Sequence, residues 1–502
     1  MANYAPRTGK VIRSDGSIVN EADGINPDGS INVRSAAEDS VGHETLTLNS
    51  MAAGLASIPE GATKAALTVE DNAARYWLDG SNPTVTAGHK LDPGDRLSLD
   101  SRSQVDKFRA IAVSGSSRLQ VSYFGVPSDG PDPGPVKVMA LVASSEKNTG
   151  FRATAAAGLI AEGGATYRDS FIFEYDTENP RFIFSNYNLQ NPGPNPITIK
   201  MAAKINGIFH SFSFGGNTTT TVAPGATVVS DPIAASVAKG QVVVVQALVT
   251  VETGQTWPTS GWTMPHVPGK TDNTAIDFPD TPASVGFGPI GCLGDISEDD
   301  KVPSIALIGS SSVMGTGDLS GQGFARRSVE GKYPYIRFGS AGYTARSFVL
   351  GSLTQLAFFQ EYTDAALIDL SSNDVESGRT LQQIKDDLMT IFTELHNRGL
   401  KVYMCTQRHR TNSTDNWNTL ENQTFPDAAK YGPGSVMDEL NIWIKTNPAP
   451  LTGYFDICDI LQDPVTRKWR TSITGENITG DGTHMRTNGA IAVSTSGIIN
   501  FT

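Results

Sequence analysis

Short apolar runs separated by clusters of turn-forming residues dominate the first half of the chain. One run, LQVSYF, alternates apolar and polar positions, so Leu119, Val121 and Tyr123 would share one face of a strand. Further on, β-branched and aromatic residues fill three segments that are typical of strands: RFIFSNYNL, PITIKMAAKI and QVVVVQALVTVET. Turn clusters such as FGGNTTTT and VAPGA bound them. The pattern predicts two successive β-sandwich modules.

After residue 290 the pattern changes to alternating strands and helices. Five apolar runs have strand length: SIALIGSS, YPYIRFGS, AALIDLSS, KVYMCTQR and GYFDICDI. The clearest helix lies in TLQQIKDDLMTIFTELHNRG, where Gly399 follows the last turn as a C-cap. Its apolar residues fall on one face: Leu381, Ile384, Leu388, Ile391, Phe392 and Leu395. Buried parallel strands with crossover helices predict a three-layer α/β sandwich.

Two segments rich in Pro and Gly divide the chain. The first, VPSDGPDPGPV, has four prolines and two glycines among eleven residues. This composition suits neither a β-strand nor a helix. The second extends from His266 to Pro289 and has similar composition. We therefore expect a β module at 1–126, a linker at 127–136, a second β-sandwich at 137–288 and the α/β domain at 289–502.

Charge and cysteine content narrow the classes of function. A formal net charge of -13, without a visible Lys/Arg cluster, disfavours nucleic acid as a partner. Cys292, Cys405 and Cys458 lie far apart without metal-ligand spacing, so we expect neither a metal nor a cofactor. No apolar signal segment and no window of about 18 apolar residues is present, which predicts cytoplasmic synthesis without membrane insertion.

Polar residues follow the predicted parallel strands at the edge where ligands bind in such sheets. Three strands end in Gly309–Ser312, Gly339–Gly342 and Ser371–Asp374, and a loop after the fifth strand carries Asp481-Gly482-Thr483-His484. A serine hydroxyl becomes a nucleophile when an imidazole accepts its proton, and a carboxylate on the other ring nitrogen fixes the tautomer. Ser311, His484 and Asp481 could supply these three groups.

These segments, in this order, resemble the four blocks of the SGNH (GDSL-type) hydrolases over about residues 300–502. The resemblance implies a flavodoxin-like fold with Ser311 as nucleophile and the DxxH residues Asp481 and His484 completing the triad. It also implies an oxyanion hole made by the backbone N–H groups of Ser311 and Gly342 and the side-chain amide of Asn373. The segment GYTARS is similar to carbohydrate acetylesterases of this superfamily.

Two positions depart from the family pattern. Ser310 replaces the usual Asp before the nucleophile, which removes a charged anchor from the turn, and Ser371 replaces the first glycine of the third block. Ser310 or Ser312 could therefore be the nucleophile in place of Ser311. Arg346 and His409 are candidate substrate-binding residues, with packing or a salt bridge as the alternative for Arg346.

Three aromatic residues of the middle segment, Tyr187, Trp257 and Trp262, could form a surface on which sugars stack. Core packing or ordinary surface exposure explains them better. We therefore expect no sugar-binding face from these residues on sequence grounds alone.

The first β module, over about sixty residues around AALTVEDNAARYWLDG, resembles a module of tailed-phage virion proteins. Together the two resemblances imply an O-acetylesterase that acts outside the cell on an acetylated polysaccharide. They also imply a virion tail or fibre component that is bound to other virion proteins and could be an oligomer. Two alternatives are a glycan-binding virion adhesin without activity and a lipase or thioesterase. The absence of a long apolar lid segment between the blocks favours a small acyl group.

Overall fold

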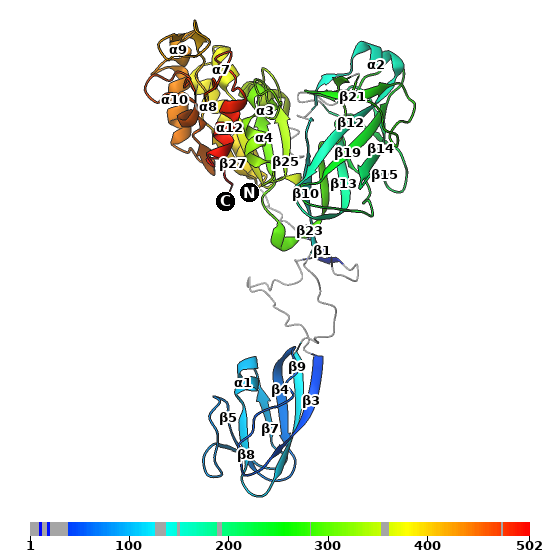
Figure 1. Cartoon of the computed structure of the whole chain (residues 1–502), viewed down its shortest axis with the longest axis vertical. Helices are drawn as coiled ribbons and strands as arrows, with labels where there is room; N and C mark the ends of the chain where they lie inside the picture. The colour runs from blue at the N-terminus through cyan, green and yellow to red at the C-terminus, as the bar shows by residue number, and fades with distance from the viewer. Residues whose placement is uncertain are drawn as a thin grey trace, which may run out of the picture. The chain divides into compact units, whose positions relative to one another are not determined.

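The computed structural model describes residues 10–12, 18–20, 39–125, 137–147, 151–187, 193–281, 283–352, 361–472 and 475–501. The chain forms two compact units, Met1–Gly134 and Pro135–Thr502 (Figure 1). Two short strands near the start, β1 (Lys10–Ile12) and β2 (Ile18–Asn20), pair with each other. The predicted linker at 127–136 lies outside the described residues.

Two antiparallel sheets around one core form the first unit. The larger has the order β3 (Asp39–Leu48), β9 (Ser117–Gly125), β4 (Ala62–Val69), β7 (Arg96–Leu99), and the smaller β6 (His89–Leu91), β5 (Ala74–Trp77), β8 (Arg109–Ala112). Helix α1 (Arg102–Lys107) connects β7 to β8. Leu119, Val121 and Tyr123 all point into the core, so the predicted period of two is confirmed.

A large antiparallel sheet makes up the first part of the second unit. Its order is β15 (Ile208–Ser211), β14 (Ile197–Ile205), β19 (Val242–Thr250), β12 (Gly164–Phe173), β10 (Lys137–Ser145), β23 (Gly291–Ser297), β13 (Thr177–Ser185), β17 (Thr227–Val229). Shorter strands join it: β16 (Thr220–Val222), β18 (Ser236–Val237), β21 (Thr263–Pro268) and β22 (Ala283–Val285). Beside it lie β11 (Phe151–Thr154), β20 (Pro258–Ser260) and α2 (Ala157–Glu162). Phe171 and Phe182 meet edge to face at 5.2 Å, so β12 and β13 pack across the interior.

The end of this β-sandwich differs from the predicted boundary at residue 288. Strand β23 begins at Gly291 and pairs with β10 on one side and β13 on the other. It therefore belongs to the sandwich, which ends at Ser297. The Pro/Gly-rich stretch before residue 290 predicts a domain boundary, but it leads into a strand of the same sheet.

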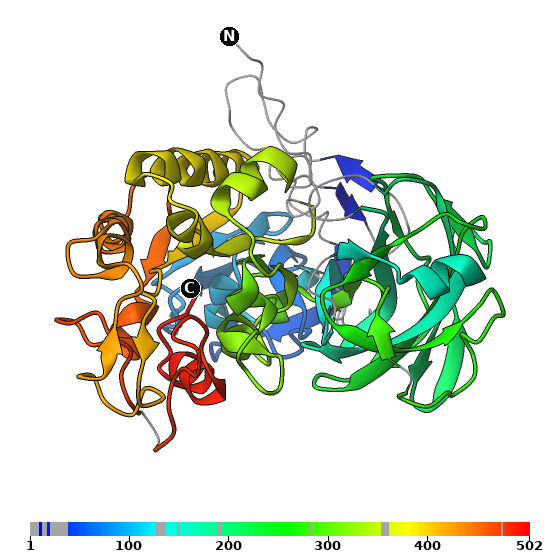
Figure 2. The same ribbon diagram turned by 90° about the horizontal axis from the view of Figure 1, so that it is seen from above.

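A five-stranded parallel sheet forms the second part of this unit, in the order β25 (Tyr335–Gly339), β24 (Ile305–Gly309), β26 (Ala365–Asp369), β27 (Lys401–Cys405), β30 (Gly453–Phe455). This is the 2-1-3-4-5 order of flavodoxin-like sheets. Helices α8 (Leu381–Asn397) and α10 (Val436–Lys445) pack on one face. Helices α4 (Gly323–Val329), α11 (Ile457–Leu461) and α12 (Thr487–Thr495) pack on the other (Figure 2).

The amphipathic helix predicted from the sequence corresponds to α8. A Thr380–Gln383 capping box begins it, and Gly399 follows with a positive φ of 86°. The last predicted strand, GYFDICDI, is wrong in its second half. Only Gly453–Phe455 is a strand, because Ile457 and Leu461 are buried four residues apart on one face of α11.

The sandwich covers the edge of the parallel sheet. Strand β25 is an edge strand, whose free N–H and C=O groups would otherwise be open to unwanted pairing. The hydroxyl of Ser144, in β10, donates to the carbonyl of Tyr335 at 2.7 Å and accepts from its N–H at 2.9 Å. The rings of Tyr187 and Phe338 lie 6.3 Å apart. One apolar core thus continues from the sandwich into the α/β layers.

This shared core predicts that the α/β part will not stand alone. A fragment of residues 302–502 should aggregate, because it exposes the β25 edge and the apolar residues beneath the sandwich. A fragment of residues 135–502 should remain monodisperse. Size-exclusion chromatography of the two fragments checks this, and a folded, monodisperse 302–502 fragment would contradict it.

Candidate active site

Ser311 lies in a tight turn after the first parallel strand. Strand β24 ends at Gly309, and α3 (Ser311–Met314) begins two residues later. A Cβ at Gly309 would lie 2.3 Å from a methyl group of Val313, so glycine is needed there for the turn to fold back. Gly315, at φ 97°, ends the helix and donates its N–H to the carbonyls of Ser311 and Ser312.

Ser311, His484 and Asp481 form one hydrogen-bonded chain. The Nε2 atom of His484 lies 2.8 Å from Oγ of Ser311, and its Nδ1 atom lies 2.7 Å from Oδ2 of Asp481. Burial raises the pKa of Asp481, but hydrogen bonds from the His484 ring and from the backbone N–H groups of His484 and Thr483 outweigh it and lower the pKa to about 2. Asp481 is therefore ionised at neutral pH.

A buried ion pair holds the neighbouring serine, Ser312. The guanidinium of Arg408 makes bonds of 2.8 and 3.0 Å to the two oxygens of Asp369, and it donates to Oγ of Ser312 at 2.9 Å. The Arg408 and Asp369 side chains are 3% and 0% exposed. The turn, which has Ser310 before Ser311, is thus held by a charged anchor at the ends of β26 and β27. With Ser312 committed to Arg408, the geometry favours Ser311 as the hydroxyl that serves His484.

Two tryptophans clamp the turn that carries Asp481 and His484. Gly482 has a φ of 71°, and a Cβ there would lie 1.7 Å from the carbonyl oxygen of Thr411 and 2.8 Å from the Trp417 ring. On the other side, the indole N–H of Trp469 donates to the Gly482 carbonyl at 2.9 Å. Only glycine fits this position, and the close packing fixes the triad turn against the loop after β27.

The predicted oxyanion residues lie on the neighbouring strand ends. Gly342, in the loop after β25, is exposed and has a φ of 75°, and the space that a Cβ would occupy is open. Asn373, in α7 (Ser372–Glu376), donates its Nδ2 to the carbonyl of Tyr343 at 3.0 Å. Its Oδ1 accepts from Arg410 at 2.8 Å, which fixes the orientation of the amide. An amide nitrogen carries two hydrogens, so Nδ2 of Asn373 can donate a second hydrogen bond.

The two predicted substrate-binding residues have other partners. Arg346, in α5 (Ala345–Ser347), is half-exposed and pairs with Asp387 of α8 at 3.4 Å. His409 is 1% exposed, and its Nδ1 lies 2.6 Å from the carbonyl oxygen of Tyr431. Burial lowers the pKa of His409 to about 4. A ring buried to this extent is not open to a substrate at Ser311, so the expectation for His409 is corrected.

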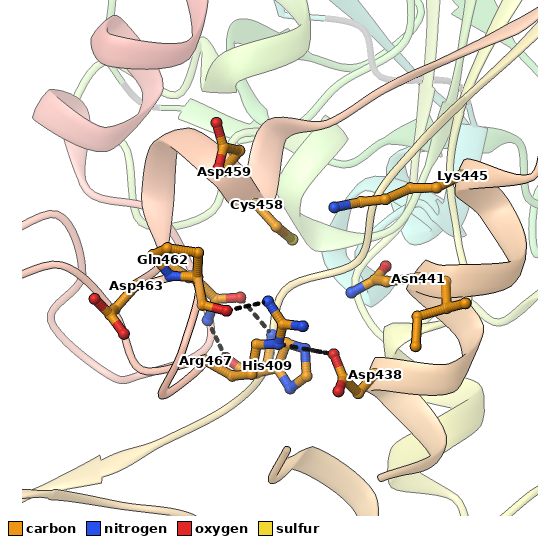
Figure 3. Close-up of a pocket in the computed structure, with 11 residues that line it drawn as sticks. His409, Asp438, Asn441, Lys445, Cys458, Asp459, Gln462, Asp463 and Arg467 are labelled. Carbon is orange, nitrogen blue, oxygen red and sulfur yellow. Dashed lines mark hydrogen bonds and ion pairs between the residues drawn. The ribbon is translucent and has the colours of Figure 1, made fainter. Parts of the chain in front are cut away.

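His409 instead lines a small polar cavity of about 70 Å³ between α10 and α11 (Figure 3). Both basic side chains that line it are in ion pairs: Arg467 with Asp438, which also lines the cavity, at 2.8 Å, and Lys445 with Asp456 at 2.5 Å. The residues that line this cavity do not include Ser311, Asp481 or His484. It is therefore separate from the candidate active site.

Sequence reasoning missed the residues that hold the site together. Arg408 and Arg410 flank His409 in TQRHR, directly after β27. Ligands bind at the carboxyl ends of the strands in such sheets, so polar residues at this position are candidates for a site. Asp369 is the last residue of β26. A charged residue such as Asp369 at the end of a buried strand needs a partner of opposite charge, and this requirement could have indicated the ion pair from the sequence.

Within the described parts of the chain, no group of three His, Cys, Asp or Glu side chains is placed to hold a metal ion. No helix among the same residues is long and apolar enough to cross a membrane.

Comparisons with known proteins give structural likeness only. Neither a family model nor a curated protein sequence matches the chain. Solved structures similar to it include a GDSL-like lipase from Bacteroides thetaiotaomicron, at 14% identity over 38% of this chain and 84% of that one, with a TM-score of 0.27. A lipolytic G-D-S-L family member from Veillonella parvula has 14% identity over 39% and 96% of the two chains, with a TM-score of 0.28. The Bacillus subtilis protein YxiM has 14% identity over 71% and 89%, with a TM-score of 0.30. Values this low do not establish function, so the site is judged by its own geometry.

Removing one partner of the buried ion pair should be costly. Arg408→Met leaves Asp369 charged and unpaired, which should lower the free energy of unfolding by about 3–5 kcal/mol. In the double variant Asp369→Asn/Arg408→Met no charge remains, so it should lose less than the sum of the two single variants. Denaturant unfolding of the four proteins measures this coupling, and strictly additive losses would refute it.

Gly482→Ala should abolish turnover of a small activated ester, because the added Cβ displaces the turn that carries His484. Gly497→Ala is the matched control, since Gly497 has the same φ of 71° but open space around it. The control bears the same backbone strain of roughly 1–2 kcal/mol without the clash. Equal activity in the two variants, measured with p-nitrophenyl acetate, would show that the contact with Thr411 is unimportant.

Proposed function

We propose that this protein is a serine esterase that removes O-acyl groups, chiefly O-acetyl groups, from a polysaccharide. The observation that carries the proposal is the continuous chain of hydrogen bonds from Ser311 through His484 to Asp481. Its order and distances are those needed for proton transfer from a serine hydroxyl to an imidazole supported by a carboxylate.

The reaction follows from these contacts. As Oγ of Ser311 attacks the ester carbonyl, its proton moves to Nε2 of His484, and Asp481 stabilises the imidazolium. The tetrahedral intermediate collapses, the C–O bond to the sugar breaks, and the sugar oxygen takes the proton from His484. Water then attacks the acyl-Ser311 ester and passes its proton to His484. Collapse releases the carboxylic acid and returns the proton to Ser311.

Hydrogen-bond donors at adjacent strand ends stabilise the oxyanion of the tetrahedral intermediate. Ser311 begins α3, so its backbone N–H lacks a partner within the helix. The N–H of Gly342 and the amide of Asn373 complete the proposed set. Arg410 acts as a positioning residue, because its bond to Oδ1 of Asn373 turns the Nδ2 group toward the site. Each lost donor costs about 2.7–4 kcal/mol of barrier.

The preference for an acetylated sugar rests on the GYTARS segment and its likeness to carbohydrate acetylesterases. The likeness of the first β module to virion proteins supports a location on a phage tail or fibre, where the enzyme would act on a host surface glycan. A non-catalytic adhesin is the second candidate. The aligned Ser311, His484 and Asp481 side chains favour the enzyme, because glycan binding alone requires no such alignment.

Loss of the nucleophile is the first test. Ser311→Ala should lower kcat on p-nitrophenyl acetate by roughly 10⁴- to 10⁶-fold while the melting temperature stays near that of the wild type. Ser312→Ala removes only a contact with Arg408 and should keep a measurable rate. If activity survives in Ser311→Ala and is lost in Ser310→Ala or Ser312→Ala, the nucleophile has been assigned to the wrong residue.

The substrate class is tested by the products. The enzyme should release acetate from an acetylated polysaccharide, and EDTA should leave the rate unchanged because the triad performs the chemistry. Among p-nitrophenyl esters the rate should fall from acetyl to octanoyl. A preference for octanoyl would favour a lipase, and glycan binding without acetate release would favour the adhesin.

A further inference from the structure

A groove lies between the β-sandwich and the loop that follows the nucleophile helix. Its volume is about 410 Å³, within the range of small-molecule sites. Glu146 and Lys147 follow β10, Trp262 and Thr263 come from the start of β21, and the loop side contributes Leu319 to Gln322. Both halves of the second unit therefore build it.

One short loop connects this groove to the catalytic residues. At one end of the loop, Gly317 packs on His484, where a Cβ would lie 2.9 Å from the histidine Cβ. At the other end, Gly321 packs on the Trp262 ring, where a Cβ would lie 3.1 Å away. Four residues span at most about 14 Å, so Trp262 and His484 are separated by no more than a few sugar units. The indole N–H of Trp262 also donates to the carbonyl of Met314, in the nucleophile helix, at 2.9 Å.

The groove is preformed. Arg337, which is 2% exposed, donates to the carbonyls of Gly321 and Gln322 on one wall and of Glu146 on the other, at 3.0–3.1 Å. In the loop, Asp318 accepts from the N–H of Gly323 and from Arg327. Both walls are thus fixed by buried charged groups, and a ligand need not order them.

The lining suits a sugar. Trp262 is partly exposed in the groove, whereas Trp257 and Tyr187 are 0% and 4% exposed and belong to the core. An indole offers a flat apolar face to the C–H groups of a pyranose ring. Lys147 and Gln322, which also line the groove, carry hydrogen-bonding groups for hydroxyls. This mixture of one aromatic platform and several polar side chains is typical of ligand sites.

We propose that this groove is a subsite for a second sugar residue of the polysaccharide whose acyl group reacts at Ser311, with Trp262 as its stacking platform. The inference rests on the proposed function and deepens it. The sandwich then contributes directly to substrate recognition, and the enzyme acts on polymers in preference to single acetylated sugars.

The test compares polymer with small ester. Trp262→Ala should lower kcat/KM for acetate release from acetylated xylan or acetylated pectin about tenfold, equivalent to about 1.4 kcal/mol, mainly through KM. Its rate on p-nitrophenyl acetate should fall far less than its rate on the polymer, because this small ester has no second sugar to place in the groove. Trp262→Phe keeps an aromatic face and should retain most of the polymer activity. Tyr454→Ala is the control, since Tyr454 is an exposed aromatic on β30, the opposite edge strand of the parallel sheet.

Three results would overturn the subsite. Unchanged polymer kinetics in Trp262→Ala would show that no sugar is bound there. A tenfold fall on p-nitrophenyl acetate in both Trp262→Ala and Trp262→Phe, which lose the same N–H bond to Met314, would show that Trp262 supports helix α3 and does not bind a sugar. A wild-type protein that hydrolyses p-nitrophenyl acetate but neither polymer would overturn the proposed polysaccharide substrate together with the subsite.

Discussion

The ion pair between Asp369 and Arg408 is the interaction on which the candidate active site depends most. Asp369 ends the central strand β26 with no exposed surface, and an unpaired charge there would be strongly destabilising. Arg408 neutralises it with one bond from each terminal nitrogen, and Nη2 also donates to the hydroxyl of Ser312. Three strand ends, those of β24, β26 and β27, are thereby tied together. Ser311 is left facing His484.

The second constraint is the shared core of the sandwich and the α/β layers. Parallel sheets need cover on both faces and leave edges that must be protected. Here the sandwich protects β25 through Ser144, and Arg337 joins the walls of the groove above it. A contact that the fold needs for its stability therefore also creates a recess close to the triad. Stability and the proposed recognition of a polymer are linked through the same surface.

Much of this arrangement could be predicted from local patterns. Period-two burial in β9, the face of α8 and the five parallel strands all follow from the spacing of apolar residues. The positions of Ser311 and Asn373 just after strands, and of Asp481 and His484 in a later loop, predict that all four lie at the same edge of the sheet. Such features are encoded by residues that are close in sequence.

The remainder depends on contacts between distant residues. Strand β23 pairs with β10, which lies far away in the sequence, so the Pro/Gly-rich stretch before β23 predicts a domain boundary where the sheet in fact continues. The exposure of Trp262, and the burial of His409 against Tyr431, depend on which elements pack around them. Likewise, nothing near Ser312 in the sequence indicates that Arg408 binds its hydroxyl. Tertiary packing decided each of these cases.

Covalent labelling measures the central claim most directly, because it reports which atom is nucleophilic. A fluorophosphonate probe should modify the full-length protein once, and mass spectrometry of the digested protein should place the adduct on Ser311. The same treatment of His484→Ala should give little adduct, since the serine then lacks its base. An adduct on Ser310 or Ser312, or equal labelling of the wild type and His484→Ala, would contradict a Ser311–His484–Asp481 esterase.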